Sequence, residues 1–365
     1  MHDRELFEKA FSPLHASPDT LTEVRKTMRN EKKTRRALGK SAVVAIAAAL
    51  TLTIAVAGGI VTLIRADVSP ADKVDDTTHH AFTDDLDATT PTVDDGKGTA
   101  VSVPDMERIP GDIQTTQRLV GKYLSKLDAE MTVEGNTIRL GTLLIDESGS
   151  GMLTYSVENP NGVKYTDAGY GEAVDMSAEP SMWLGSAPDA QGYGGTCINS
   201  RCHVDEDAST DTRLQVVLYF AAGKDFQKGD DFYFTVRDSA YQPYSISIQP
   251  QTYVPVKTMT SGSETLTLSP LGMSIRNAHP DREPLVDELT LRYQDGSEFT
   301  VESSSRSLMN WVVGCMRGSD DVPFADNTYV FDRLVDVDAV SSVTLEGHQH
   351  TDGAADDTFT LTYQP

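Results

Sequence analysis

The pattern of hydrophobic and polar residues contains one long apolar stretch. Residues 41–64 carry no charged side chain. As a helix rising 1.5 Å per residue, about 24 residues span roughly 36 Å, enough to cross a hydrocarbon core of about 30 Å. The stretch lacks the polar stripe of a surface helix, and it is too long and starts too late for a signal peptide. The pattern therefore predicts a single transmembrane helix over residues 41–64.

The charges on either side of this stretch predict its orientation. Residues 1–40 hold ten Lys and Arg and six Asp and Glu, whereas acidic residues predominate after residue 64. By the positive-inside rule, the N-terminus is expected in the cytoplasm and the C-terminal domains outside the cell membrane. The basic flank would contact anionic lipid of the inner leaflet. Because residues 41–365 hold 21 Lys and Arg against 49 Asp and Glu, this part of the chain is strongly acidic, and we expect no direct binding to nucleic acid.

Residues 1–40 also carry apolar positions at helical spacing, in two short segments. The pair Ser12-Pro13 ends the first segment, and Ser17-Pro18 is typical of a helix start. Fewer than about 40 residues rarely bury a core of their own. The apolar stripe is therefore expected either to bind a protein groove or a membrane surface, or to belong to a disordered anchor. Its members are Leu6, Phe7, Phe11, Leu14, Leu21, Val24 and Met28.

Beyond the apolar stretch, helical spacing gives way to alternation. Residues 65–103 are rich in Asp, Thr and Pro and predict an acidic disordered linker. Residues 104–252 begin with a predicted helix over 112–130 and continue as strands, which indicates a first extracellular α+β domain. Residues 253–365 read as a second, all-β domain with its strongest hairpin signal at Asp295-Gly296. The predicted fold class is a mainly β, β-sandwich-like extracellular region with one helix at its start, plus the transmembrane helix and a short helical tail.

A Gly-, Pro- and Asp-rich insert without periodicity occupies residues 158–212. It contains Cys197 and Cys202, and an exported compartment would permit a disulfide between them. Two reduced thiols, or a metal site that includes His203, are the alternatives. The insert also carries aromatic side chains that either anchor the loop or contact a ligand, namely Tyr165, Tyr170, Trp183 and Tyr193.

Catalytic signatures are missing from the sequence. It has no G-x-S-x-G elbow, H-E-x-x-H motif, P-loop or dinucleotide fingerprint. Acidic residues between 205 and 211 imitate a calcium loop, but Thr210 replaces the required glycine and Val216 the bidentate glutamate. We therefore expect neither an enzyme nor a bound cofactor or metal.

Three places in the chain resemble one family of bacterial membrane proteins. They are residues 11–21 (FSPLHASPDTL), residues 136–140 with 155–159 (NTIRL and YSVEN), and residues 268–272 with 336–347 (LSPLG and DVDAVSSVTLEG). Over nearly its full length the chain is similar to single-pass proteins of Gram-positive bacteria that carry domains of unknown function. Genes of that family often lie beside extracytoplasmic-function sigma factors.

The resemblance implies a signal-transduction protein of the anti-sigma-factor type with an immunoglobulin-like C-terminal domain. In this hypothesis the cytoplasmic stripe binds an extracytoplasmic-function sigma factor, and the exterior responds to an unknown extracellular ligand or signal. Residues 1–40 contain no cysteine for a zinc site, so binding would depend on the apolar stripe and the basic helix. The alternative hypothesis is a surface-anchored binding or adhesion module with a passive tail.

Overall fold

The second half of the predicted transmembrane stretch forms strands. In the computed structural model, β1 (Thr51–Val56) and β2 (Gly59–Arg65) pair as an antiparallel hairpin. The stretch is rich in β-branched residues and is interrupted by Gly58-Gly59, and both features disfavour a helix. Among the residues that the structure describes, no helix combines the length and apolar character needed to span a bilayer. The predicted fold class, a single-pass membrane protein with a transmembrane helix, is therefore wrong on this point.

The structure describes residues 51–56, 59–71, 74, 92–94, 100–102, 113–163, 165–167, 172–174, 180–222, 226–276, 284–306, 308–319, 322–349 and 357–365. The predicted helical tail over residues 1–40 lies outside them, as do the start of the apolar stretch and most of the acidic linker. The chain divides into two units, Met1–Ala48 and Ala49–Pro365, and every described residue belongs to the second.

The helix predicted over residues 112–130 is also corrected. The helix α4 (Ile113–Leu119) is followed by the 3-10 turn η1 (Gly121–Tyr123) and then by the strand β6 (Ser125–Val133). Buried and exposed residues alternate strictly along β6, which is the pattern of a half-buried strand. The apolar residues from 119 to 127 fit a helical spacing as well, and packing in the sheet decides between the two.

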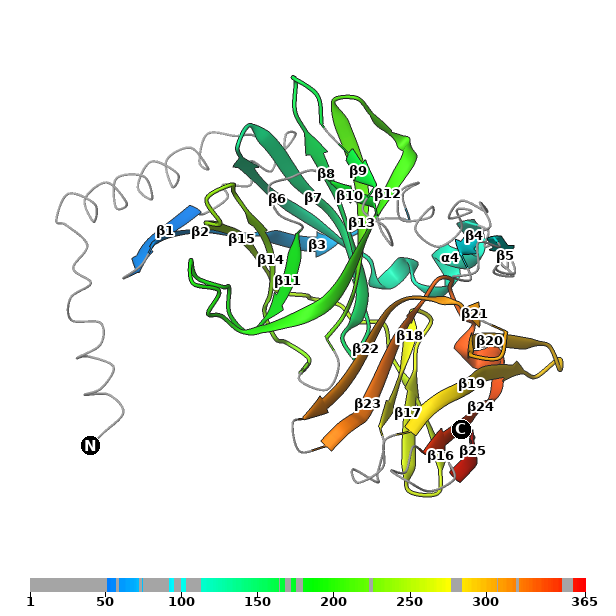
Figure 1. Ribbon diagram of the computed structural model, residues 1–365. Coiled ribbons are helices and arrows are strands. Elements are labelled where there is room, and N and C mark those ends of the chain that lie inside the picture. The colour runs from blue at the N-terminus through cyan, green and yellow to red at the C-terminus, as the bar shows by residue number, and fades with distance from the viewer. Residues whose placement is uncertain are drawn as a thin grey trace, which may run out of the picture. The chain divides into compact units, whose positions relative to one another are not determined.

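An eleven-stranded sheet forms what we call the first lobe. Its strands follow the order β1-β2-β15-β14-β11-β12-β13-β8-β7-β6-β3 (Figure 1). The strands not yet given are β3 (Asp67–Pro70), β7 (Asn136–Ile145), β8 (Ser150–Glu158), β11 (Ser181–Leu184), β12 (Thr196–Thr210), β13 (Arg213–Ala221), β14 (Phe232–Arg237) and β15 (Pro243–Ile248).

One continuous segment connects the two ends of this sheet. Strand β2 pairs in parallel with β15, and β3 pairs antiparallel with β6, so residues 59–70 run from one end of the sheet to the other. Ile64 and Ala66 of this segment are buried in the core. The sheet therefore curls around one apolar core, and residues 59–70, which we call the closing segment, complete it. The predicted disordered linker starts inside this segment.

The insert predicted to lack regular structure contributes several strands. Strand β12 covers most of its second half and pairs with β11 on one side and β13 on the other. The short strands β9 (Tyr165–Asp167) and β10 (Glu172–Val174) pair with each other. The strand β12 was missed because polar residues occupy most of its length, and its place between two other strands cannot be read from its own sequence.

The second lobe is a sandwich of two five-stranded sheets. One sheet has the order β16-β17-β18-β23-β22 and the other β21-β20-β19-β24-β25, and residues of both contribute to one core. The Asp295-Gly296 hairpin is confirmed between β19 and β20, with Gly296 at φ +87°. The strands are β16 (Lys257–Ser261), β17 (Glu264–Leu268), β18 (Gly272–Arg276), β19 (Pro284–Tyr293), β20 (Glu298–Ser303), β21 (Leu308–Met309), β22 (Trp311–Ser319), β23 (Val322–Phe331), β24 (Val340–Gln349) and β25 (Asp357–Tyr363).

A third apolar cluster joins the two lobes, and we call this region the joint. Its members come from the turn after α4, from strands of the first lobe, from the connection around Val254 and from the second lobe. The backbone of Val254 also bonds to Ile145 and Glu147 of the first lobe. The fully buried members include Val120, Leu144, Met152, Val217, Val254 and Leu271. The lobes therefore share part of their apolar core.

Candidate binding surface

Three turns of the first lobe are built on the same plan around an aspartate. In each, the Asp amide bonds to the carbonyl four residues later, and its carboxylate accepts the amides of the second and fourth residues after it. The residue three positions after each aspartate has a positive φ. The turns begin at Asp146, Asp189 and Asp238.

Tyr241 breaks the residue pattern of these turns. The positive-φ position is glycine in two of them, Gly149 at +83° and Gly192 at +85°, but it is Tyr241 at +62° in the third. A residue with a Cβ is strained in this region by roughly 1–2 kcal/mol. The Tyr241 side chain is also 68% exposed, so its ring gains little from burial in the lobe. The turn requires a positive φ, but glycine would adopt it without strain, so a strained tyrosine at this position is an indication of function.

Arg237 links the turn of Tyr241 to the turn of Gly192. Its Nη1 donates to the Tyr241 carbonyl at 3.1 Å, and its Nη2 lies 3.8 Å from the position a Cβ on Gly192 would take. The turn between β6 and β7 joins them, because the Glu134 carboxylate accepts hydrogen bonds from the amide and hydroxyl of Ser239. The turns at Asp189 and Asp238 and the turn between β6 and β7 therefore lie together. We call residues 134, 189–193 and 238–242 the tyrosine surface.

The aromatic residues predicted in the insert have different outcomes. Tyr193 belongs to the tyrosine surface and is 76% exposed, the largest exposed fraction among the described large apolar side chains. Trp183 is half-buried on β11, where its indole N–H donates to the Ser181 hydroxyl. The side chains of Tyr165 and Tyr170 lie outside the described residues. Tyr241 was missed, because its interest depends on a backbone angle that the sequence does not display.

The structure does not bring the two predicted disulfide cysteines together. Cys197 and Cys202 both lie on the extended strand β12, with Trp183 and Leu218 as their cross-strand neighbours. Five steps along a strand cover roughly 16 Å, whereas bridged Cα atoms lie about 4.4–6.8 Å apart. The Cys202 sulfur instead lies 3.4 Å from the Tyr155 hydroxyl. The predicted disulfide between Cys197 and Cys202 is therefore not formed in this structure.

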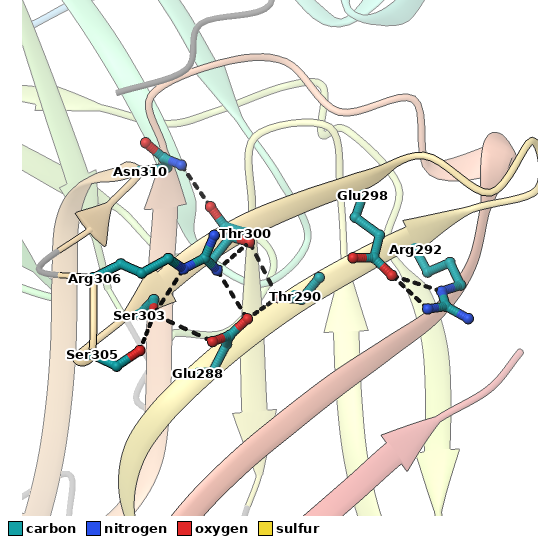
Figure 2. Close-up of polar contacts among 9 residues, drawn as sticks. All are labelled: Glu288, Thr290, Arg292, Glu298, Thr300, Ser303, Ser305, Arg306 and Asn310. Carbon is teal, nitrogen blue, oxygen red and sulfur yellow. Dashed lines mark hydrogen bonds and ion pairs between the residues drawn. The ribbon is translucent and has the colours of Figure 1, made fainter. Parts of the chain in front are cut away.

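A second candidate is the polar face of the sheet containing β19 and β20. Arg306 donates from Nη2 to Glu288 and to the Thr300 hydroxyl, both at 2.9 Å, and from Nε to Ser303 at 3.2 Å (Figure 2). Further along these strands, Arg292 forms a second ion pair with Glu298. Both arginines of this face are thus neutralised by glutamates within the sheet, so we assign the network to stability.

Threonines form a row across the same sheet. Thr290 lies opposite Thr300 on one side and Thr344 on the other, and Thr344 lies opposite Thr362. The hydroxyls of Thr290 and Thr300 are 3.3 Å apart (Figure 2). Cross-strand threonine pairs stabilise a sheet by roughly 0.2–1 kcal/mol each. The row supports the structural assignment of this face.

Replacing Arg306 by alanine is expected to lower the free energy of unfolding by about 1 kcal/mol. The loss is small because the Arg306 side chain is half exposed and water screens the ion pair. Urea unfolding at low and at 1 M salt checks this, since added salt should reduce the difference from wild type. A loss several times larger, insensitive to salt, would contradict an exposed network.

The residues predicted to bind a sigma factor cannot be placed. All seven, from Leu6 to Met28, lie outside the described residues, and so does the basic flank predicted to contact lipid. Their roles stay predictions, and they are not part of the tyrosine surface.

Comparisons with known proteins add little. Neither the models of protein families nor the curated proteins give a match. Among solved structures, the chain is similar to "The crystal structure of the conserved domain protein from Bacillus anthracis", with 10% sequence identity and a TM-score of 0.36. The match covers 66% of this chain and 90% of that chain. A likeness this distant carries no argument about function.

Proposed function

We propose that this protein is a binding protein whose tyrosine surface recognises a partner protein. The observation that carries the proposal is Tyr241, an exposed aromatic residue at a strained backbone position where two sister turns have glycine. Tyr193 on the neighbouring turn gives a second exposed ring. The proposal belongs to the class of binding modules, and it requires neither a membrane helix nor catalysis.

The chemistry of the tyrosine surface suits protein recognition. Tyrosine offers a large, amphipathic contact area and has only two side-chain torsions to order, which is why it is enriched in loops that bind proteins. The two rings stand on turns whose backbones are held by carboxylate–amide hydrogen bonds from Asp189 and Asp238. A surface that is already ordered loses less entropy on binding than a mobile loop does.

Site-specific photo-cross-linking tests this function. The photoreactive residue p-benzoylphenylalanine would replace Tyr193 or Tyr241 in the full chain, in cells that produce the protein. We expect one discrete protein adduct, identical for the two positions. Met309 is the matched control, because it is 53% exposed but lies on β21 of the second lobe. Adducts that are absent, or the same from position 309, would contradict the proposal. If the captured molecule resists protease and is degraded by glycosidases, the partner is a glycan and not a protein.

Tyr241→Gly is expected to separate stability from binding. Glycine adopts the positive φ without strain, so the free energy of unfolding should rise by up to about 1 kcal/mol. The affinity for the cross-linked partner should fall at least about tenfold, a loss of about 1.4 kcal/mol. Urea unfolding and calorimetric titration measure the two effects. Tyr193→Ala is the companion variant and should weaken binding without stabilising the fold. Unchanged affinity in Tyr241→Gly would refute the role given to this ring.

A further inference from the structure

The turn at Asp146 differs from its two sister turns in its surroundings. It lies in the joint, and the Asp146 side chain is almost completely buried. One carboxylate oxygen accepts the amides of Ser148 and Ser150, at 2.8 and 2.9 Å. The other oxygen accepts the hydroxyl of Ser269, a residue of the second lobe, at 2.6 Å. A single buried carboxylate thus connects the backbone of one lobe to the other lobe.

The second lobe holds Ser269 in place for this contact. The Ser269 hydroxyl oxygen accepts the amides of Leu271 and Gly272, at 3.0 and 3.2 Å, and Ser269 is itself fully buried. Beside it, the hydroxyls of Ser148 and Thr267 lie 3.1 Å apart, again across the joint. The alignment of the two lobes therefore depends on polar contacts around Asp146 as well as on the shared apolar cluster.

Among the residues that the structure describes, the hydrogen-bond partners of the Asp146 carboxylate include no cation. The facing turn and strands of the second lobe, residues 265–275, contain no charged residue, and neither does the connection over 249–256. Within the Asp146 turn itself, Glu147 is the charged neighbour, and it is paired with Lys228 at 2.7 Å. Burial raises the pKa of Asp146 to about 6, although the hydrogen bonds from Ser269 and from the turn amides oppose this rise.

We propose that Asp146 is a proton-operated latch of the joint, which holds the two lobes together more firmly when the carboxyl group is protonated. On protonation the carboxylate gains one proton from solvent and becomes neutral, so the cost of a buried charge disappears. The neutral acid can still accept the Ser269 hydroxyl at one carboxyl oxygen and the two turn amides at the other. The contact across the joint survives in both states, but the ionised state is the costlier one.

The direction of the pH dependence follows from linkage. The pKa of Asp146 is about 6 in the folded protein and near 3.8 in the unfolded chain. The folded state therefore binds the proton more tightly. Its contribution to stability is therefore largest at low pH and is lost as the pH rises from about 4 to above 6. Between pH 5 and pH 7.5 the unfolding equilibrium constant should rise about tenfold from this group alone.

Asp146→Asn tests the proposal, since asparagine has nearly the shape of the protonated acid and cannot titrate. Urea unfolding measures the stability of both full-length proteins at pH 5 and pH 7.5. Both proteins carry the same other carboxylates, so the ratio of their unfolding constants at each pH removes the contribution of those groups. We expect the ratio of unfolding constants, wild type over variant, to be about tenfold greater at pH 7.5. In hydrogen exchange corrected for intrinsic rates, the Leu271 and Gly272 amides should lose protection in wild type over this range and keep it in the variant.

Two further outcomes decide against the latch. Stability curves of wild type and Asp146→Asn that run parallel between pH 5 and pH 7.5 would overturn it. If Asp146→Asn fails to fold, Ser269→Ala takes its place, because it removes the hydroxyl that stabilises the ionised carboxylate. That variant should lose more stability at pH 7.5 than at pH 5, and an equal loss at both pH values would also overturn the proposal.

Discussion

Replacing Ile64 by aspartate is expected to lower the free energy of unfolding by about 4 kcal/mol or more. Ile64 lies in the closing segment, opposite Ile246 of β15, and is buried in the core of the first lobe. A carboxylate at this position would have to be desolvated without a cation beside it, which is among the most destabilising changes a core can undergo. The sheet would also lose the residue that seals it where β2 meets β15.

The neighbouring residue provides the control for this prediction. Arg65 is exposed, and its guanidinium donates to the Gln249 side chain at the surface. Arg65→Ala should therefore change stability by no more than about 0.5 kcal/mol. Urea unfolding followed by the fluorescence of Trp183, which lies in the same sheet, measures both variants. Equal, small effects of the two substitutions would mean that residues 59–70 do not close the lobe.

The closing segment also shows where local sequence patterns were ambiguous. A run of uncharged residues is compatible with a membrane helix or with buried strands, and the length of the run favoured the helix. The content of β-branched residues and the Gly58-Gly59 pair pointed to strands, but each signal is weak on its own. What decides is pairing with β15 and β6, residues more than 50 positions further along the chain. Such long-range partners cannot be read from a single sequence.

Turn chemistry was the part of the fold that the sequence predicted best. Asp295-Gly296 gave a hairpin because the glycine can adopt a positive φ, and both strands form on either side of it. The helix predicted over residues 112–130 ends early, at Leu119, because the apolar residues that follow it, such as Leu124 and Leu127, are buried in the joint and in the core of the sheet instead. Local chemistry therefore located turns reliably, whereas short apolar stretches needed the rest of the sheet.

The candidate site was predicted only in part. Tyr193 stood out as an aromatic residue in a Gly-rich loop, and it is highly exposed. Tyr241 did not stand out, although the three turns share a detectable pattern in which an aspartate precedes the positive-φ residue by three positions. Two of them read Asp-x-x-Gly, and the third departs from this only at Tyr241. Many aspartates of the chain lack a glycine three positions later, so this departure becomes recognisable only with the observed φ of Tyr241.

Leu271→Ala is expected to uncouple the unfolding of the two lobes. Leu271 is 1% exposed and belongs to the joint, so its truncation should cost about 2–5 kcal/mol, mostly from contacts between the lobes. The two tryptophans of the chain lie in different lobes, Trp183 on β11 and Trp311 on β22, so Trp311→Phe and Trp183→Phe backgrounds report the two lobes separately. With a shared core, both signals should change at one urea concentration in wild type, and at two in the variant.

Leu268→Ala is the matched control, since Leu268 is equally buried but belongs to the second lobe's own core. Its truncation should weaken the second lobe and leave the joint intact. Both tryptophan signals should then shift together to lower urea, because an intact joint transmits the loss to the first lobe. Two results together would show that the joint does not couple the lobes. Leu268→Ala would lower the urea midpoint of the Trp311 signal alone, and Leu271→Ala would leave the midpoints of both tryptophan signals equal. Coupling would instead mean that any event at the tyrosine surface that stabilises the first lobe also stabilises the second.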